Sequence, residues 1–264
     1  MDNRPIGFMD SGVGGLTAVK SLHQLLPDEK AIYIGDEARV PYGPRPTTEV
    51  VDFAIQMGDF LVSKNVKAIV IACNTATGAS LPTLQARYNI PVIGVIQPGA
   101  EAALRTSNSK RIGVIATDGT IKSKIYSETI HKLDQNAFVK ELACQDFVRI
   151  VEANQSKAPE TESIVKKQLK QLEPDNLDTL ILGCTHFPHL RSAIQTAVGE
   201  QVQLVDPGLQ AVSDLKEQLQ KTDGFVGQTV ESEEYYTTAN LEEFKTIADD
   251  LLGMNTNVQL AKID

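Results

Sequence analysis

The chain has 264 residues, of which 42% are hydrophobic and 22% charged, a composition typical of a globular protein with one large or two medium cores. Its net charge of −9 argues against a surface for nucleic acid or an anionic membrane, although helix N-termini can still bind an anionic substrate. No apolar run approaches the roughly 18 residues that span a bilayer. The first residues lack the apolar core of a signal peptide, and the three cysteines form no CxxC pair, so we expect a cytoplasmic protein.

The first half of the chain predicts alternating strands and helices. Leucine and valine between the first two strands share one helical stripe that ends at Pro27, and a second stripe begins at Val50. Short apolar runs typical of buried parallel strands lie near residues 5–9, 31–35, 67–72 and 91–95.

The alternation restarts after Pro98-Gly99, which predicts a second parallel sheet with right-handed crossovers. Its strands are expected near residues 111–115, 137–142, 178–183 and 201–205. The segment from Gly208 onward predicts helices near residues 208–221 and 240–252. Because this segment is too short for a core of its own, we expect it to pack on one of the two lobes.

Landmarks of the first half recur in the second half in the same order and at a nearly constant offset. Asp10 and Thr117 end similar strands, the Pro98-Gly99 pair recurs as Pro207-Gly208, and Cys73 corresponds to Cys184. Order and spacing together indicate an internal duplication. We therefore predict two similar α/β lobes.

The two corresponding cysteines lie in the stretches KAIVIACNTAT and DTLILGCTHFP. Each follows a predicted buried strand, at the edge of an α/β sheet where ligands bind. Hydrogen-bonding residues come next, beginning with Asn74 after Cys73, and with Thr185 and His186 after Cys184. A helix N-terminus or an imidazolium favours the thiolate form of such a cysteine. Two thiols facing one cavity can remove a proton from one face of a stereogenic carbon and return one to the other face, which predicts racemisation without a cofactor.

A dinucleotide site is the alternative for the glycine-rich segment Ser11–Gly15, with Asp36 as the acid that binds ribose. The nucleotide fingerprint requires a third glycine where this chain has Thr17, and Asp10 would repel a pyrophosphate. We interpret the segment as a tight strand–helix turn that exposes backbone N–H groups.

Other uses of the cysteines are disfavoured. Cys184 and His186 supply two zinc ligands but no second pair at zinc-finger spacing, so we expect no metal. Nothing signals the lysine and phosphate site of a pyridoxal phosphate enzyme. Cys144 lacks the pattern of the other two cysteines, and we interpret it as structural.

The motifs MDSGVGGLT, GDEARVPYG, CNTAT and GCTHFP together resemble those of the bacterial glutamate racemases over essentially the whole chain. In the related aspartate racemases a glutamate usually replaces His186. The resemblance implies two α/β lobes related by a pseudo-twofold axis, with a cofactor-free active site between them. It also implies that the tail returns to the first lobe, so that residues 1–97 plus 208–264 form one lobe and residues 98–207 the other. The expected role is to supply D-glutamate for peptidoglycan, and the resemblance allows a homodimer.

Carried over by position, the resemblance makes Cys73 and Cys184 the acid/base thiols, acting on D-glutamate and L-glutamate respectively. Asp10 becomes the partner of Cys73, and His186 the partner of Cys184. Acidic positions of the family also match Asp36 and Glu152. Besides these thiols and their partners, the implied substrate contacts are Ser11, Pro41, Tyr42, Gly43, Asn74, Thr75, Thr117, Thr120 and Thr185.

The chain departs from the family pattern at Arg45, Arg149 and His189, which leaves the thiols unaffected. Two rival functions remain open. One is racemisation of aspartate or a hydantoin by the same scheme, and the other is a protein that binds an amino acid without turning it over.

Overall fold

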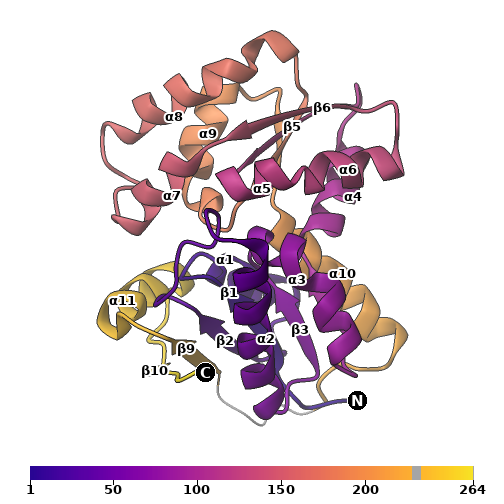
Figure 1. Ribbon diagram of the computed structural model, residues 1–264, viewed down its shortest axis with the longest axis vertical. Coiled ribbons are helices and arrows are strands. Elements are labelled where there is room, and N and C mark those ends of the chain that lie inside the picture. The colour runs from indigo at the N-terminus through magenta and orange to yellow at the C-terminus, as the bar shows by residue number, and fades with distance from the viewer. Residues whose placement is uncertain (228–232, 264) are drawn as a thin grey trace. The chain divides into compact units, whose positions relative to one another are not determined.

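The computed structural model describes residues 1–227 and 233–263, and these residues divide into two compact units (Figure 1). One unit comprises Met1–Val95 with Gly208–Asp264, and the other comprises Ile96–Pro207. Each unit is built around its own parallel sheet, which confirms the α/β class with two parallel sheets. Among the described residues, no helix has the length and apolarity needed to cross a bilayer.

The sheet of the first unit has the strand order β10-β9-β2-β1-β3-β4, with every pair parallel. Its central strands are buried along their whole length, as expected for apolar runs covered by helices on both faces. The elements of this unit are β1 (Ile6–Asp10), α1 (Leu16–Leu25), β2 (Ala31–Gly35), α2 (Thr47–Ser63), β3 (Ala68–Ile71), α3 (Asn74–Arg87), β4 (Val92–Gly94), α10 (Pro207–Lys221), β9 (Glu234–Thr237), α11 (Leu241–Leu252) and β10 (Val258–Leu260).

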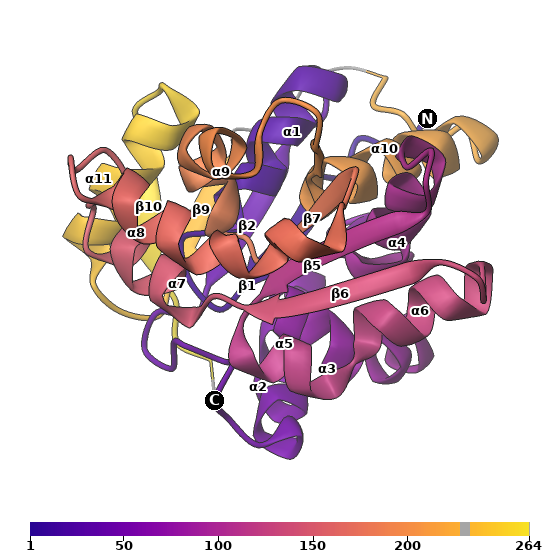
Figure 2. The same ribbon diagram turned by 90° about the horizontal axis from the view of Figure 1, so that it is seen from above.

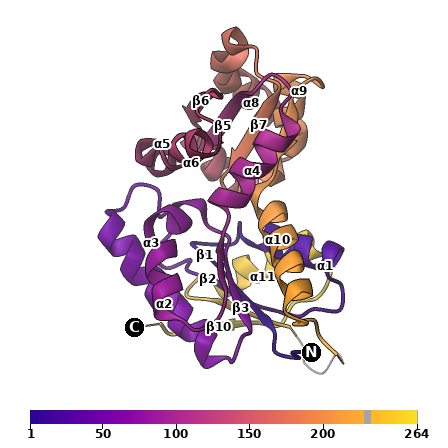
Figure 3. The same cartoon turned by 90° about the vertical axis from the view of Figure 1, so that its right-hand side faces the viewer.

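Helices cover both faces of this sheet (Figure 3). On one face Phe8 and Tyr33 pack in a cluster with α1, α10 and α11. On the other face the adjacent strand residues Met9 and Ile34 pack with α2 and α3. The side chains of a strand alternate between faces, so a single apolar run supplies both cores.

The tail contains more than the two helices expected from its sequence. It also supplies β9 and β10, which extend the first sheet beyond β2 and were missed. Tyr235 of β9 pairs with Tyr33 of β2 across some 200 residues of sequence. Both strands are short, and their pairing partner is remote, so local periodicity gave no signal for them.

The sheet of the second unit has the order β6-β5-β7-β8. This repeats the order β2-β1-β3-β4 of the first unit and agrees with an internal duplication. One face is covered by α7, α8 and α9, and the other by α4 and α6 (Figure 2). The elements are α4 (Ile96–Thr106), β5 (Arg111–Ala116), α5 (Asp118–Ser123), α6 (Ile125–Leu133), β6 (Phe138–Ala143), α7 (Gln145–Glu152), α8 (Thr161–Leu169), the 3₁₀ helix η1 (Lys170–Asp175), β7 (Thr179–Gly183), the 3₁₀ helix η2 (Phe187–Leu190), α9 (Arg191–Val198) and β8 (Gln203–Val205).

A buried ion pair contacts both the N-terminal segment and the segment that follows α10. Lys67 Nζ lies 2.6 Å from Glu29 Oε2, and both side chains are only 2% exposed. The ammonium also donates to the carbonyls of Asp2 at 2.8 Å and Gly224 at 2.9 Å. Glu29 accepts a further hydrogen bond from the amide of Val226 at 3.0 Å. The charge pair therefore helps to hold the N-terminal segment and the segment after α10 in place.

Replacing Lys67 with methionine should lower the free energy of unfolding by about 3–5 kcal/mol, because it leaves a buried carboxylate without its cation. Urea denaturation followed by circular dichroism measures the loss. The matched control is Lys221→Met, whose ammonium is 77% exposed and 3.9 Å from Glu217; it should cost less than about 0.5 kcal/mol. Equal losses in the two variants would contradict a stabilising role for the pair.

Candidate active site

Cys73 lies where β3 has ended and α3 begins. It is the N-cap residue of α3, and its sulfur accepts a hydrogen bond from the amide of Ala76 at 3.4 Å. The thiol is 3.9 Å from the hydroxyl of Ser11 and is only 6% exposed. A helix N-terminus stabilises negative charge, so this position favours a thiolate.

Asp10 ends the neighbouring strand β1 and is fully buried. Its Oδ2 accepts hydrogen bonds from the amides of Gly15 at 2.9 Å and Gly12 at 3.4 Å. A side chain at Gly15 would place Cβ 2.5 Å from the Cβ of Asp10, so only glycine allows this approach. The amides that a pyrophosphate would use in a dinucleotide site therefore hold the Asp10 carboxylate instead.

Asp36 is the centre of a second buried group. Its Oδ2 accepts hydrogen bonds from the phenol of Tyr42 and from Arg39 Nε, the latter at 2.6 Å. Its Oδ1 accepts from the hydroxyl of Thr238 at 2.9 Å. Burial and the charge of Asp36 raise the pKa of Tyr42, so this phenol stays protonated. Asp36 thus fixes the position of Tyr42, whereas the neighbouring Pro41 is exposed.

Cys184 follows β7 in the second unit and forms a chain of polar contacts. Its sulfur lies 3.6 Å from Nδ1 of His186, and Nε2 of this imidazole lies 3.4 Å from Glu152 Oε1. Cys184 and His186 are buried, whereas the Glu152 side chain is 35% exposed. Nδ1 of His186 faces the thiol, so the imidazole can exchange a proton with Cys184, while the Glu152 carboxylate lies near the other ring nitrogen.

Small polar residues also lie at the strand ends next to those that carry the thiols. In the second unit, Thr117 caps α5: its hydroxyl oxygen accepts from the amide of Thr120 at 3.4 Å, and the two hydroxyls are 3.1 Å apart. Cys73 in the first unit and Cys184 in the second thus each lie at a strand end that also carries hydrogen-bonding side chains. The remaining expected contacts Gly43, Asn74 and Thr185 are buried, and Thr75 is half-buried.

Cys144 differs from the other two cysteines. Burial raises the pKa of its thiol to about 12, so it is protonated at neutral pH. This agrees with a structural role.

Three residues depart from the family pattern. Arg149 is exposed and forms an ion pair with Asp146, and His189 is half-buried in η2. Arg45 donates a hydrogen bond to the carbonyl of Arg39 at 2.8 Å.

Sequence reasoning missed the residues that support these groups. Arg39 and Thr238 hold Asp36, and Tyr33 donates a hydrogen bond to the carbonyl of Gly12 at 2.5 Å. Tyr33 lies in an apolar strand, so its ring could be predicted to be buried, but nothing in the sequence indicated a partner for its hydroxyl. Thr238 follows β9, which the sequence did not predict.

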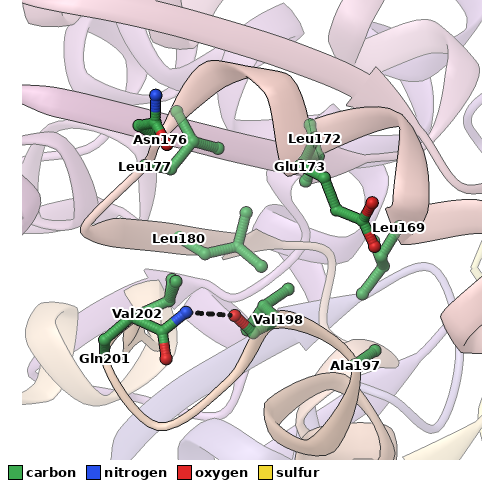
Figure 4. Close-up of a pocket in the computed structure, with 10 residues that line it drawn as sticks. All are labelled: Leu169, Leu172, Glu173, Asn176, Leu177, Leu180, Ala197, Val198, Gln201 and Val202. Carbon is green, nitrogen blue, oxygen red and sulfur yellow. Dashed lines mark hydrogen bonds between the residues drawn. The ribbon is translucent and has the colours of Figure 1, made fainter.

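A cavity of about 340 Å³ lies elsewhere in the second unit (Figure 4). It is near the start of β7, at Leu180, whereas Cys184 follows the end of that strand. Its walls come from η1 and α9, and Glu173 is the one ionisable side chain among the residues described as lining it. It contains none of the expected site residues. Within the described part of the chain, no cluster of three or more histidine, cysteine or acidic side chains could hold a metal.

Comparison with known proteins agrees with this geometry. The model of the Asp/Glu/Hydantoin racemase family matches residues 6–215. The chain is 52% identical to a glutamate racemase of Pediococcus pentosaceus, with 100% of both sequences covered. The crystal structure of a glutamate racemase isoform from Bacillus anthracis has a TM-score of 0.95 at 39% identity, covering 99% of this chain and 98% of that one. The glutamate racemase of Francisella tularensis in complex with D-glutamate has a TM-score of 0.91 at 36% identity, covering 100% and 98%. The chain belongs to the Asp/Glu/hydantoin racemase family.

Proposed function

We propose that this chain is a glutamate racemase, which interconverts L-glutamate and D-glutamate without a cofactor and supplies D-glutamate for peptidoglycan. The observation that carries the proposal is a buried thiol at a strand end in each unit, each with its own polar partners. The full-length relative from Pediococcus and the structural neighbours are glutamate racemases, which favours glutamate over aspartate or a hydantoin as the substrate.

In the proposed reaction each thiol serves one enantiomer. The Cys73 thiolate removes the Cα proton of D-glutamate, and the electron pair of the broken C–H bond remains on the substrate as a carbanion. The Cys184 thiol then donates its proton to the opposite face of Cα and forms L-glutamate. The reverse reaction begins with a Cys184 thiolate. A cycle in one direction leaves the two thiols with exchanged protonation states.

The partners of each thiol support these proton transfers in different ways. His186 takes the thiol proton of Cys184 at Nδ1, and the resulting imidazolium stabilises the thiolate, with Glu152 behind it. At Cys73 the N-terminus of α3 supplies the corresponding positive potential. Asp10 handles the proton at Cys73 and is held for that task by the glycine loop.

The substrate contacts supply hydrogen bonds rather than opposite charges. The resemblance selects hydroxyls from Ser11 and Thr75 in the first unit, and from Thr117 and Thr185 in the second. Hydroxyls and backbone N–H groups bind carboxylates without a cation. A glutamate site in a chain of net charge −9 is therefore physically consistent.

Optical rotation of L-glutamate incubated with a catalytic amount of the protein should decay to zero, because the two enantiomers have equal free energy. L-Aspartate under the same conditions should keep its rotation. Cys73→Ala and Cys184→Ala should each lower the rate at least 100-fold, since general acid–base groups contribute roughly 10²–10⁴-fold.

Cys144→Ala is the matched control for these cysteine variants and should keep most of the activity. A constant rotation with wild-type protein would support the amino-acid-binding alternative. A rate above about a tenth of wild type in either of the other cysteine variants would rule out that thiol as an obligatory acid or base.

Asp10→Asn and His186→Asn should have opposite effects on kinetic isotope effects. The equilibrium constant is one, so every variant keeps equal kcat/KM values in the two directions. Damage at Cys73 makes its proton transfer more rate-limiting. With Cα-deuterated substrates, Asp10→Asn should raise the isotope effect on kcat/KM for D-glutamate and lower it toward one for L-glutamate.

His186→Asn should give the mirror pattern, with the larger effect on L-glutamate. Thermal unfolding of both variants checks that the fold is intact. A larger isotope effect for L-glutamate in Asp10→Asn would show that Asp10 is not the partner of Cys73.

A further inference from the structure

Tyr33 connects the core of the first unit to the loop Ser11–Gly15, which follows Asp10 in the sequence. It lies in the middle of β2 and its side chain is fully buried. Its phenol donates a hydrogen bond to the carbonyl of Gly12, with the two oxygens 2.5 Å apart. Gly12 is also one of the two residues whose amides bind the Asp10 carboxylate. A single residue of the loop is therefore bound on one side by Tyr33 and on the other by Asp10.

The loop is packed so closely against these groups that it has little freedom to move. A Cβ at Gly15 would lie 2.8 Å from the phenol oxygen of Tyr33 and 2.5 Å from the Cβ of Asp10. A Cβ at Gly35, at the end of β2, would lie 2.7 Å from the carbonyl oxygen of Gly12. All three distances are shorter than van der Waals contact. The glycines allow the loop to come close, and the phenol fixes where its carbonyl points.

The electrostatic surroundings keep the phenol in the donor state. Burial, followed by the negative charges of Asp10 and Glu37, raises the pKa of Tyr33 well above its ordinary value. Tyr33 therefore stays protonated at neutral pH and can donate its hydrogen bond to the Gly12 carbonyl.

We propose that Tyr33 is a positioning residue for proton transfer at Cys73: by holding the Gly12 carbonyl it fixes the loop amides that orient the Asp10 carboxylate. The inference rests on the proposed function. It concerns the half of the reaction that uses Cys73, so its signature is an effect that differs between the two enantiomers.

Tyr235 is a matched control within the same sheet. It stands directly beside Tyr33 in the register of β9 and β2, and it is also fully buried. Its phenol donates to Glu233 Oε2 at 2.6 Å instead of to the loop. Removing either hydroxyl deletes one hydrogen bond of a buried tyrosine, but only the bond of Tyr33 is to the loop that holds Asp10.

Tyr33→Phe should lower kcat about ten- to a hundredfold, since small misplacements of a catalytic group cost up to about 100-fold. KM for both enantiomers should change less than about threefold. The isotope effect on kcat/KM should rise for Cα-deuterated D-glutamate and fall toward one for L-glutamate. Tyr235→Phe should leave kcat within about twofold and both isotope effects unchanged, at a comparable cost in melting temperature.

Replacement of Tyr33 by 4-aminophenylalanine, which keeps a donor at the same place, should restore most of kcat and the wild-type isotope effects. This variant also serves if Tyr33→Phe does not fold. The proposal is overturned if Tyr33→Phe and Tyr235→Phe have the same kcat, or if the isotope effects of Tyr33→Phe change equally for both enantiomers. It is also overturned if the isotope effects of the 4-aminophenylalanine variant differ from those of wild type equally for both enantiomers. Failure of the proposed function itself would give a different result, because wild-type protein would then leave the optical rotation of L-glutamate unchanged.

Discussion

A buried thiol requires stabilisation of its charged form before it can act as a base, and the carboxyl ends of parallel strands provide this. Cys73 ends a strand against the N-terminus of α3, where an amide donates to its sulfur. Cys184 ends another strand against the imidazole of His186. Both thiols are less than 10% exposed, so water does little to stabilise their thiolate forms. The helix N-terminus at Cys73 and the imidazole at Cys184 must therefore provide this stabilisation.

Much of the polar chemistry of the first unit is used to hold loops in place. Asp10 binds loop amides, and Asp36 binds Tyr42, Arg39 and Thr238. Buried carboxylates that accept several hydrogen bonds lose the freedom to reorient, and this makes the site rigid. Cys144 also follows a strand and precedes a helix, but its side chain accepts no capping hydrogen bond, and burial raises its pKa. Position in the fold alone is not sufficient for reactivity.

The sequence predicted the elements whose signals are local. The apolar runs that place Cys73 and Cys184 after strand ends correspond to β3 and β7 within one residue. The contact of His186 with Cys184 could be expected, because they are two residues apart. Glu152, by contrast, reaches His186 from α7, and only the resemblance singled it out.

Interactions between remote segments could not be derived in the same way. β9 joins β2 from the far end of the chain, and it is only four residues long. Thr238 depends on that pairing to reach Asp36. The hydroxyl of Tyr33 finds the Gly12 carbonyl only through the register of β1 and β2. Such contacts depend on sheet order, which periodicity does not specify.

The central claim is that two thiols act on opposite faces of one substrate carbon, and solvent deuterium tests it most directly. L-Glutamate is converted in D₂O, the enantiomers are separated at early times, and deuterium at Cα is measured by mass spectrometry. D-Glutamate should carry deuterium from the start, because its new proton comes from a thiol equilibrated with solvent. The remaining L-glutamate should stay unlabelled, since a proton abstracted by Cys184 returns before it exchanges. Equal early labelling of both enantiomers would indicate a single base and contradict the account.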